Sequence, residues 1–476
     1  MPDTVLLTKL SSARRRLAFY LLLLGAFLPS LNMFVVTIAL PSIRESLGAS
    51  ASQTSLIVSG YSSAYAVFLI TGGRLGDLFG RRLMFLCGMA GFTATSLICG
   101  LSPNAEILLA GRVCQGISAA LMAPPVLAGI RTLFSQQEIP WALNIYGTGI
   151  GIAVAGGQLL GGVLIAVDPW QLGWRSSFLI NVPVGLLALI AAPFLVPESG
   201  GRKKPRLDVG GVVLLSAALA SFVLPLSMGR ERQWDFWVLT MLAASPLLAI
   251  AFFFFERWYL RWGGVPILQA SMLKIRSFRL GLVVAFLFFF TTPFYLFFSL
   301  YLQAGLGEGP LAAGLAVLPY GIANFLGPML ATRFPAAMRP QLFWLGMTLE
   351  VLGYAVIALC AATQTMGWVL FMVLFAAGFG QGVAMPEMIH SILGDIPDEH
   401  AGLAAGMMNS TLQLGAAISV AAVGSLFFAV LGSGTMAADY GHALGFSMAS
   451  QVVALTLSML LGIRIARRTV VPRRDR

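Results

Sequence analysis

One acidic side chain stands deep inside a long apolar stretch of the sequence, where a charge is costly. Glu350 lies about nine residues into the apolar segment 341–361, near mid-depth of a membrane-crossing helix that rises about 1.5 Å per residue. An unpaired carboxylate at that depth costs several kcal/mol unless it takes up a proton or a cation. We expect Glu350 either to carry a proton or cation, or to be a neutral, hydrogen-bonded acid that serves packing.

Two further ionisable residues lie in apolar segments. Arg112 is about seven residues from one end of the segment 106–130, so it can point into the protein or extend to the membrane surface. Glu387 follows a proline near the end of the segment 368–390, and we expect it at the membrane interface. With Glu350, these two residues are the candidates for proton coupling.

The sequence lacks the side-chain sets that catalysis or metal binding would need. The three histidines are dispersed, and the four cysteines lie in apolar segments without metal-ligand spacing. There is no Gly-x-x-x-x-Gly-Lys-Ser/Thr loop to bind ATP, and no nucleophile–base pair stands out. We therefore expect no enzymatic activity, no metal and no cofactor, and any transport must run on an ion or solute gradient.

The elements that position these residues are membrane-spanning helices. Apolar residues make up 58% of the chain and charged residues only 10%, too few for a water-soluble surface. The apolar runs are continuous and about twenty residues long, which predicts helices rather than a barrel. About fourteen segments qualify: 17–38, 53–71, 83–101, 106–130, 140–166, 176–196, 209–227, 237–255, 279–302, 311–331, 341–361, 368–390, 402–431 and 444–467.

The distribution of basic residues predicts the orientation. With the N-terminus inside, cytoplasmic segments hold 25 of the 30 lysines and arginines, and this bias requires an even number of spans. We expect both termini in the cytoplasm and a multi-pass protein of a cell membrane, most simply a bacterial cytoplasmic membrane. The net charge of +11 then reflects orientation in lipid, and no nucleic-acid partner is implied.

The two halves of the chain show a related pattern. Gln115–Gly116 precedes Pro124 in the fourth segment, and Gln381–Gly382 precedes Pro386 in the twelfth. This agrees with a parallel repeat of six spans on either side of an inserted pair. The expected domains are an N-terminal six-helix bundle, two inserted helices with cytoplasmic linkers, and a C-terminal six-helix bundle, at residues 1–200, 201–265 and 266–476.

The loop after the second segment is the most informative motif. It reads Gly-Arg-Leu-Gly-Asp-Leu-Phe-Gly-Arg-Arg, with glycines that permit a tight turn and an aspartate suited to a helix start or an arginine partner. This order resembles the signature of the major facilitator superfamily, and the resemblance implies a cytoplasmic latch that holds the outward-open state. The latch candidates are Gly73, Arg74, Asp77, Gly80, Arg81 and Arg82.

Other stretches resemble the fourteen-span drug:proton antiporter branch of that family. Leu109–Arg112 with Gln115 is similar to its fourth-span motif, whose arginine the resemblance ties to proton coupling. The fifth segment is similar to its glycine-rich antiporter motif, in which small residues four apart allow close packing and a gating role. The gating candidates are Gly147, Gly151, Gly157, Gly161 and Gly162.

Three positions depart from the pattern of that branch. Asn32 stands where the first span carries an aspartate, and an asparagine cannot titrate. Gln158 replaces a proline of the antiporter motif, and Ala336 replaces the aspartate expected in the second copy of the latch. The candidates for the substrate cavity are Asn32, Gln115, Gln158, Asn181, Gln303 and Asn324.

These features predict a secondary active transporter that exports small, hydrophobic or drug-like compounds in exchange for protons by alternating access. A selective gradient-driven metabolite carrier with different coupling is the alternative, because Asn32 replaces the acid. A membrane receptor or channel without coupled transport is a third possibility. The expected partners are a small-molecule substrate, protons and membrane lipids, with the protein acting as a monomer.

Overall fold

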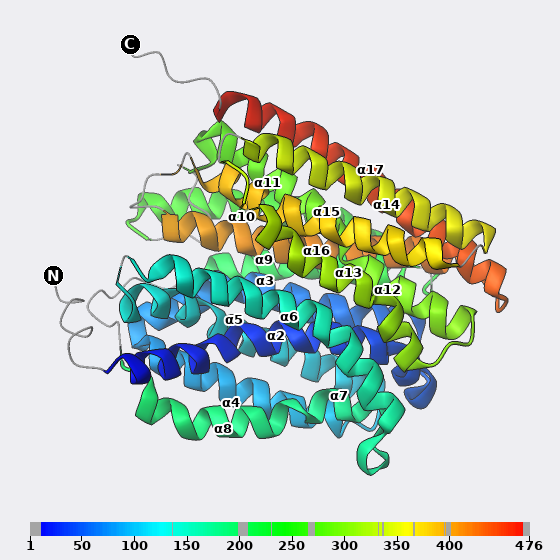
Figure 1. Ribbon diagram of the computed structural model, residues 1–476, viewed down its shortest axis with the longest axis horizontal. Coiled ribbons are helices and arrows are strands. Elements are labelled where there is room, and N and C mark those ends of the chain that lie inside the picture. Colours follow the sequence, from blue (N-terminus) through cyan, green and yellow to red (C-terminus); the bar gives the residue numbers. More distant parts are fainter. Residues whose placement is uncertain are drawn as a thin grey trace.

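The computed structural model describes residues 11–135, 137–198, 208–229, 231–264, 272–331, 333–335, 338–364, 367–394, 396 and 401–469. Long helices dominate these ranges and run roughly along one direction (Figure 1). The N-terminal helices are α2 (Ser12–Leu47), α3 (Ala51–Phe79), α4 (Arg81–Gly100), α5 (Ala105–Leu133), α6 (Ile139–Val167), α7 (Ser176–Leu179) and α8 (Asn181–Leu195). Next come α9 (Val209–Met228) and α10 (Phe236–Arg261). The C-terminal helices are α11 (Arg276–Phe288), α12 (Pro293–Leu300), α13 (Pro310–Ala331), α14 (Arg339–Thr363), α15 (Trp368–Leu393), α16 (Ala401–Leu431) and α17 (Ala437–Thr469).

Twelve of the described helical stretches are long and apolar enough to cross a membrane. A thirteenth is α6, which bends by 41° between Ile145–Val154 and Gly156–Val167. The prediction of an all-helical membrane protein is confirmed. The predicted number of fourteen spans is not confirmed, because α3 is outside the set that meets these criteria.

The helices form two groups with a pair between them in sequence. The N-terminal helices α2–α8 fill the lower half of Figure 1, and the C-terminal helices α11–α17 fill the upper half. Helices α9 and α10 pack against each other, and α9 also contacts α3 and α16, one helix from each group. The start of α2 and the end of α17 lie at the same end of the molecule, here called the terminal end; the opposite end is the far end (Figure 1).

Local sequence signals explain where the first helices begin and end. At the far end, Gly48 adopts a left-handed conformation (φ +61°) that terminates α2. Ser50 and Gln53 then form a capping box that starts α3. Asn104 and Asp235 cap α5 and α10, each accepting a hydrogen bond from the amide three residues later. Short polar caps therefore reverse the chain between apolar helices.

Corresponding glycines make corresponding contacts in the two groups. A Cβ on Gly116 of α5 would lie 2.4 Å from the carbonyl oxygen of Tyr61 on α3. A Cβ on Gly382 of α15 would lie 2.4 Å from the carbonyl oxygen of Asn324 on α13. In both cases only glycine lets the two backbones approach so closely. This is the pattern that a repeat with matching Gln–Gly pairs would produce.

One span of the C-terminal group is broken near its middle. Helix α11 ends in a short 3-10 turn, η4 (Phe289–Thr291), before α12, and a π-helical turn, η5 (Tyr301–Gly305), follows α12. Side chains from neighbouring helices bond to the break: Gln381 donates to the Thr291 hydroxyl at 3.0 Å, and Ser419 donates to the Phe289 carbonyl oxygen at 3.3 Å. Irregular backbone at this depth is thus held by protein groups rather than exposed to lipid.

Candidate functional site

Arg112 is at the centre of a buried polar cluster among the N-terminal helices. Its side chain is completely buried, so it does not extend to the membrane surface. The Nη1 group donates to Asn32 Oδ1 at 2.6 Å and to Gln115 Oε1 at 2.7 Å, and Nε donates to the carbonyl oxygen of Ile57 at 3.0 Å. The guanidinium also lies over the Tyr61 ring, 4.1 Å from its centroid. Two predicted cavity residues, Asn32 and Gln115, are therefore brought together by Arg112.

All the hydrogen-bond acceptors around this guanidinium are neutral. Gln115 is itself held in place because its Nε2 donates to the Ser96 hydroxyl at 2.8 Å. In the part of the chain that the structure describes, no carboxylate forms an ion pair with Arg112. Arg112 Nη2 and Asn32 Nδ2 also have no hydrogen-bond partner there. A buried cation without a counter-ion is costly, which makes this cluster a candidate functional site.

Glu350 is buried among aromatic residues of the C-terminal helices. It is completely inaccessible to solvent, and neither carboxyl oxygen has a hydrogen-bond partner among the described residues. Tyr295, Tyr320 and Tyr354 are close enough to interact with it electrostatically. The hydroxyls of Tyr320 and Tyr354 lie 3.2 Å apart and bond to each other. The sequence drew attention to Glu350 but gave no sign of this tyrosine cluster.

An aromatic contact connects the two helical groups beside these centres. Phe34, two residues after Asn32 on α2, meets Tyr295 of α12 edge-on with ring centroids 4.8 Å apart. Tyr295 in turn packs against Phe294 and Tyr320. The arginine cluster and the glutamate cluster therefore lie on opposite sides of the boundary between the two groups.

The glycines of α6 let this helix fit between the two groups. Cβ atoms on Gly157 and Gly161 would lie within about 3 Å of backbone or Cβ atoms of α2, whereas one on Gly162 would lie 2.6 Å from the Pro310 carbonyl oxygen of α13. A Cβ on Gly151 would touch the Phe325 ring at 3.0 Å. Gly147, by contrast, faces open space. Four of the five predicted gating glycines thus divide between contacts with α2 and contacts with α13, and Gly147 makes neither.

The remaining cavity candidates do not form one group. Gln158 donates to the Thr37 hydroxyl on α2 at 2.7 Å. Gln303 donates to the Ile38 carbonyl oxygen at 3.0 Å and so joins the two groups. Asn181 is buried with its Nδ2 unpartnered among the described residues, and Asn324 is half-buried on α13. These four residues do not contact Arg112 through any hydrogen bond described here.

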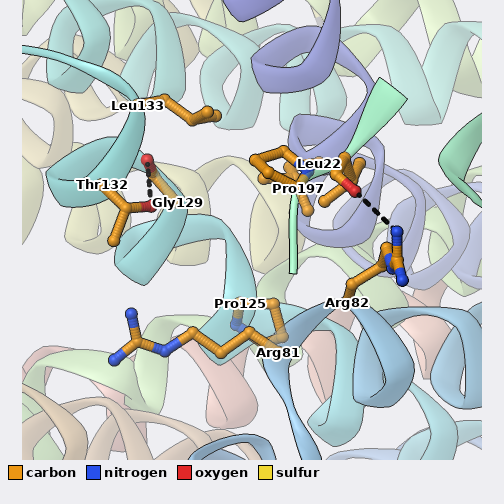
Figure 2. Close-up of a pocket in the computed structure, with 9 residues that line it drawn as sticks. Leu22, Arg81, Arg82, Pro125, Gly129, Thr132, Leu133 and Pro197 are labelled. Atoms are coloured by element: carbon orange, nitrogen blue, oxygen red, sulfur yellow. Dashed lines mark hydrogen bonds between the residues drawn. The ribbon is translucent and has the colours of Figure 1, made fainter. Parts of the chain in front are cut away.

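The loop between α3 and α4 is tied to the end of α8. Arg82 Nε lies 3.5 Å from Glu198 Oε2, and the Arg82 amide donates to Glu198 Oε1 at 3.2 Å. Arg82 also donates to the Val196 carbonyl oxygen at 3.4 Å, a contact seen beside Pro197 in Figure 2. Gly80 has φ +102°, a conformation that other residues rarely adopt. Sequence patterns alone did not single out Glu198, because an acid shortly after an apolar segment is also typical of an ordinary loop.

Other parts of the predicted latch are placed differently or lie outside the described residues. The side chains of Arg74 and Asp77 lie outside the described residues, and so does Ala336. A Cβ on Gly73 would make only ordinary contacts, whereas Gly72 makes the close approach, with its Cβ position 2.3 Å from the Ala120 carbonyl oxygen. Arg81 lines the small cavity shown in Figure 2.

Glu387 has a partner of opposite charge, unlike Glu350. Its Oε2 lies 3.8 Å from Nε of Arg339 at the start of α14, and Arg339 also contacts Nε2 of His390. His390 is exposed, and Glu387 is largely buried. Glu387 thus lies toward the terminal end of the molecule, and its position at the membrane interface stays a prediction.

Two cavities of the described residues, one at each end of the molecule, lie away from the central clusters. The cavity in Figure 2 lies between α2, α5 and the end of α8, and its volume of about 10 Å³ holds about one water molecule. The other, of about 200 Å³, lies at the far end and is lined by α3, α9 and α16. The central clusters are closed to solvent in this conformation.

A comparison with known protein families shows to which superfamily the chain belongs. A family model described as the Major Facilitator Superfamily matches residues 22–420. The chain belongs to this superfamily. It is a membrane transporter and not an enzyme.

Curated relatives of this facilitator include transport and resistance proteins of bacteria. It is 35% identical over 430 residues to a probable actinorhodin transporter of Streptomyces coelicolor, covering 88% of this chain and 74% of the relative. It is 32% identical over 413 residues to a tetracenomycin C resistance and export protein of Streptomyces glaucescens, covering 86% and 75%. It is 29% identical over 446 residues to the methylenomycin A resistance protein of Bacillus subtilis, covering 92% of each.

Solved structures show the same fold for this facilitator. A bacterial homologue of the human lysosomal transporter Spinster, in an inward-facing and occupied conformation, superposes with a TM-score of 0.66. The two chains are 16% identical, and the match covers 96% of this chain and 98% of the other. At this identity the likeness concerns the fold alone.

Proposed function

We propose that this facilitator exports small, largely hydrophobic compounds in exchange for protons. Its relatives support export, because two are named for resistance to antibiotics and a third for actinorhodin transport. The observation that carries the proton-coupled part is Glu350, a fully buried carboxyl whose oxygens have no hydrogen-bond partner among the described residues. Such a group is far less costly with a proton bound, so proton binding and release change the energy of the buried state.

Near the far end, several contacts join the two groups of helices. Alternating access would open these contacts. Gln303 bonds to the Ile38 carbonyl oxygen, Ser55 donates to the Val420 carbonyl oxygen at 3.4 Å, and Gly162 packs on Pro310. Hydrogen bonds and glycine contacts of this kind can break and re-form, as a gate between two conformations requires. Protonation of Glu350, next to the aromatic contact across the boundary, would bias the two groups toward one arrangement.

The proposed membrane arrangement follows the sequence pattern. Helix α3, with 29 residues, would be the fourteenth span, and both termini would lie in the cytoplasm of a bacterial cell. The proposed domains are residues 1–200, the inserted helices within 201–265, and 266–476. The protein would act as a monomer in direct contact with membrane lipids.

Inverted membrane vesicles provide the test of this function. An acidic lumen should drive uptake of the neutral fluorescent dye Nile red into vesicles that contain the protein, and collapse of the pH gradient should release it. The control vesicles come from the same cells without the protein. Equal dye uptake with and without the protein would contradict export of hydrophobic compounds, and uptake that ignores the gradient would contradict proton coupling.

A selective carrier for one metabolite is the second candidate. The observation in its favour is that Asn32, Arg112 and Gln115 form a cluster of fixed polar groups rather than a smooth apolar surface. Fixed donors discriminate between ligands more strongly than an apolar pocket does. Such a carrier would not transport Nile red in the same vesicles.

A further inference from the structure

The unpaired N–H donors of Arg112 and Asn32 are a feature that the proposed function does not use. The guanidinium has five N–H groups, and the described acceptors satisfy the one on Nε and the two on Nη1. The two on Nη2 have no partner, and the two on Asn32 Nδ2 have none either. Asn32 is 1% exposed and Arg112 is not exposed at all, so bulk water does not satisfy these groups.

These two sets of donors lie on either side of a single hydrogen bond. Nη2 is separated from Nη1 by one guanidinium carbon, and Nδ2 is separated from Oδ1 by one amide carbon. Because Nη1 donates to Oδ1 at 2.6 Å, the unpaired nitrogens belong to two groups that are directly hydrogen-bonded to each other. The orientation of the Asn32 amide is fixed by the same contact, since only its oxygen can accept from a guanidinium.

The cluster also lacks negative charge. Asn32, Gln115, Ser96 and the Ile57 carbonyl oxygen are all neutral, and the described residues offer Arg112 no carboxylate. Burying a guanidinium without a counter-ion costs several kcal/mol, and a charged acceptor recovers much of that cost. A carboxylate carries a negative charge and can accept several N–H hydrogen bonds, so it matches what the unpaired donors of Arg112 and Asn32 lack.

Aromatic rings complete the surroundings of these donors. Tyr61 lies under the guanidinium, and the Phe178 ring centroid is 6.0 Å from its central carbon. A ligand whose negative oxygen bonds to the donors would place its body among apolar and aromatic side chains. This combination favours an aromatic acid over a small inorganic ion.

We propose that Arg112 and Asn32 form a binding site for the carboxylate of an aromatic organic acid, which is the anionic part of a transported compound. The proposal rests on the proposed function, because it describes a class of its substrates. The acid enters when the helices separate, and its carboxylate supplies the counter-ion that Asn32 does not provide. The site is occluded in the present conformation, as an alternating-access transporter requires.

Asn32→Asp is the decisive variant because it adds a counter-ion while keeping Arg112 and the size of the side chain. An aspartate at this position would pair with Arg112 and leave no positive charge for a ligand. Arg112→Gln is less informative, since loss of the central donor could prevent folding. Asn104→Asp is the matched control: it makes the same chemical change at an exposed helix cap, where aspartate caps as well as asparagine.

The measurement is the unfolding temperature of the purified full-length protein in lipid nanodiscs at pH 7, without any gradient. Benzoate should raise this temperature for the wild type and for Asn104→Asp, and benzamide, its neutral analogue, should not. Asn32→Asp should unfold at a higher temperature than the wild type without ligand, and its affinity for benzoate should fall about tenfold or more.

Four results would overturn the proposal. They are no response of the wild type to benzoate, an equal response to benzamide, an equal response to chloride at the same concentration, and an unchanged benzoate response in Asn32→Asp. The vesicle assay uses a neutral dye and a gradient, whereas this one uses neither. Failure of dye export with intact benzoate binding would therefore count against the proposed function alone.

Discussion

Gly80→Ala tests whether the loop between α3 and α4 depends on the backbone geometry seen here. Gly80 has φ +102° and ψ 138°, and a Cβ there would lie 2.5 Å from Glu198 Oε1. The carboxylate is at the end of a flexible side chain and can move away at small cost. The backbone cannot, because a non-glycine residue in this region costs about 1–3 kcal/mol.

The ion pair at this loop contributes less than the backbone. Arg82 and Glu198 have side chains that are 35% and 40% exposed, so solvent screens their attraction to about 1 kcal/mol or less. Glu198→Gln should therefore destabilise the protein less than Gly80→Ala does. We expect about 1–3 kcal/mol for Gly80→Ala and about 1 kcal/mol or less for Glu198→Gln.

Reversible unfolding of the protein from mixed micelles, with increasing denaturing detergent, measures both variants against the wild type. Gly80→Ala should be less stable than Glu198→Gln. Stability equal to the wild type for Gly80→Ala would refute the strained conformation. A larger loss for Glu198→Gln than for Gly80→Ala would show that the carboxylate, not the glycine, controls this loop.

Three further predictions concern gating, acid stability and orientation. Gly162→Ala should abolish transport in a folded protein, because its Cβ would meet the α13 backbone at 2.6 Å; Gly156→Ala, with open space around it, should retain transport in the same vesicle assay. The pKa of Glu138 is lowered, mainly by hydrogen bonds from Ser135 and then by Arg15, so its stabilising effect is complete above the ordinary value of 4.5 and is lost as the pH falls. Glu138→Gln should accordingly lower the unfolding temperature at pH 7 and lose this effect in acid, and a constant difference across that range would contradict it. A cysteine at position 203 should react in intact cells only with membrane-permeant reagents, and labelling by an impermeant reagent would reverse the predicted orientation.

The sequence was sufficient for the class of fold and for selecting Glu350 as a residue deep within an apolar run. Continuous apolar runs reveal helices, and the position of Glu350 within its run places it far from either end. Sequence motifs also selected Arg112, Asn32 and Gln115 as functional candidates. Their mutual contact could not be derived, because Asn32 and Arg112 lie 80 residues apart on different helices.

The facing surfaces of the helices were harder to predict for a physical reason. In a membrane, both the lipid-facing and the buried sides of a helix are apolar, so the pattern of apolar residues does not identify the contact side. The glycines of α6 show this: Gly157 packs on α2, Gly162 on α13, and Gly147 on neither. Glu198 was missed because an acid after an apolar segment resembles an ordinary loop residue until its partner Arg82 is seen.

The central claim is that Glu350 carries the proton that drives export. Its most direct test uses the purified protein in liposomes, with Nile red as the substrate, and compares accumulation driven by a pH gradient with exchange of dye at equal pH. Glu350→Gln should abolish the first and retain the second, because the amide keeps the shape of the side chain but cannot exchange a proton. Glu45→Gln, at an exposed acid near the far end, should retain both. Gradient-driven accumulation at the wild-type level in Glu350→Gln would contradict the claim.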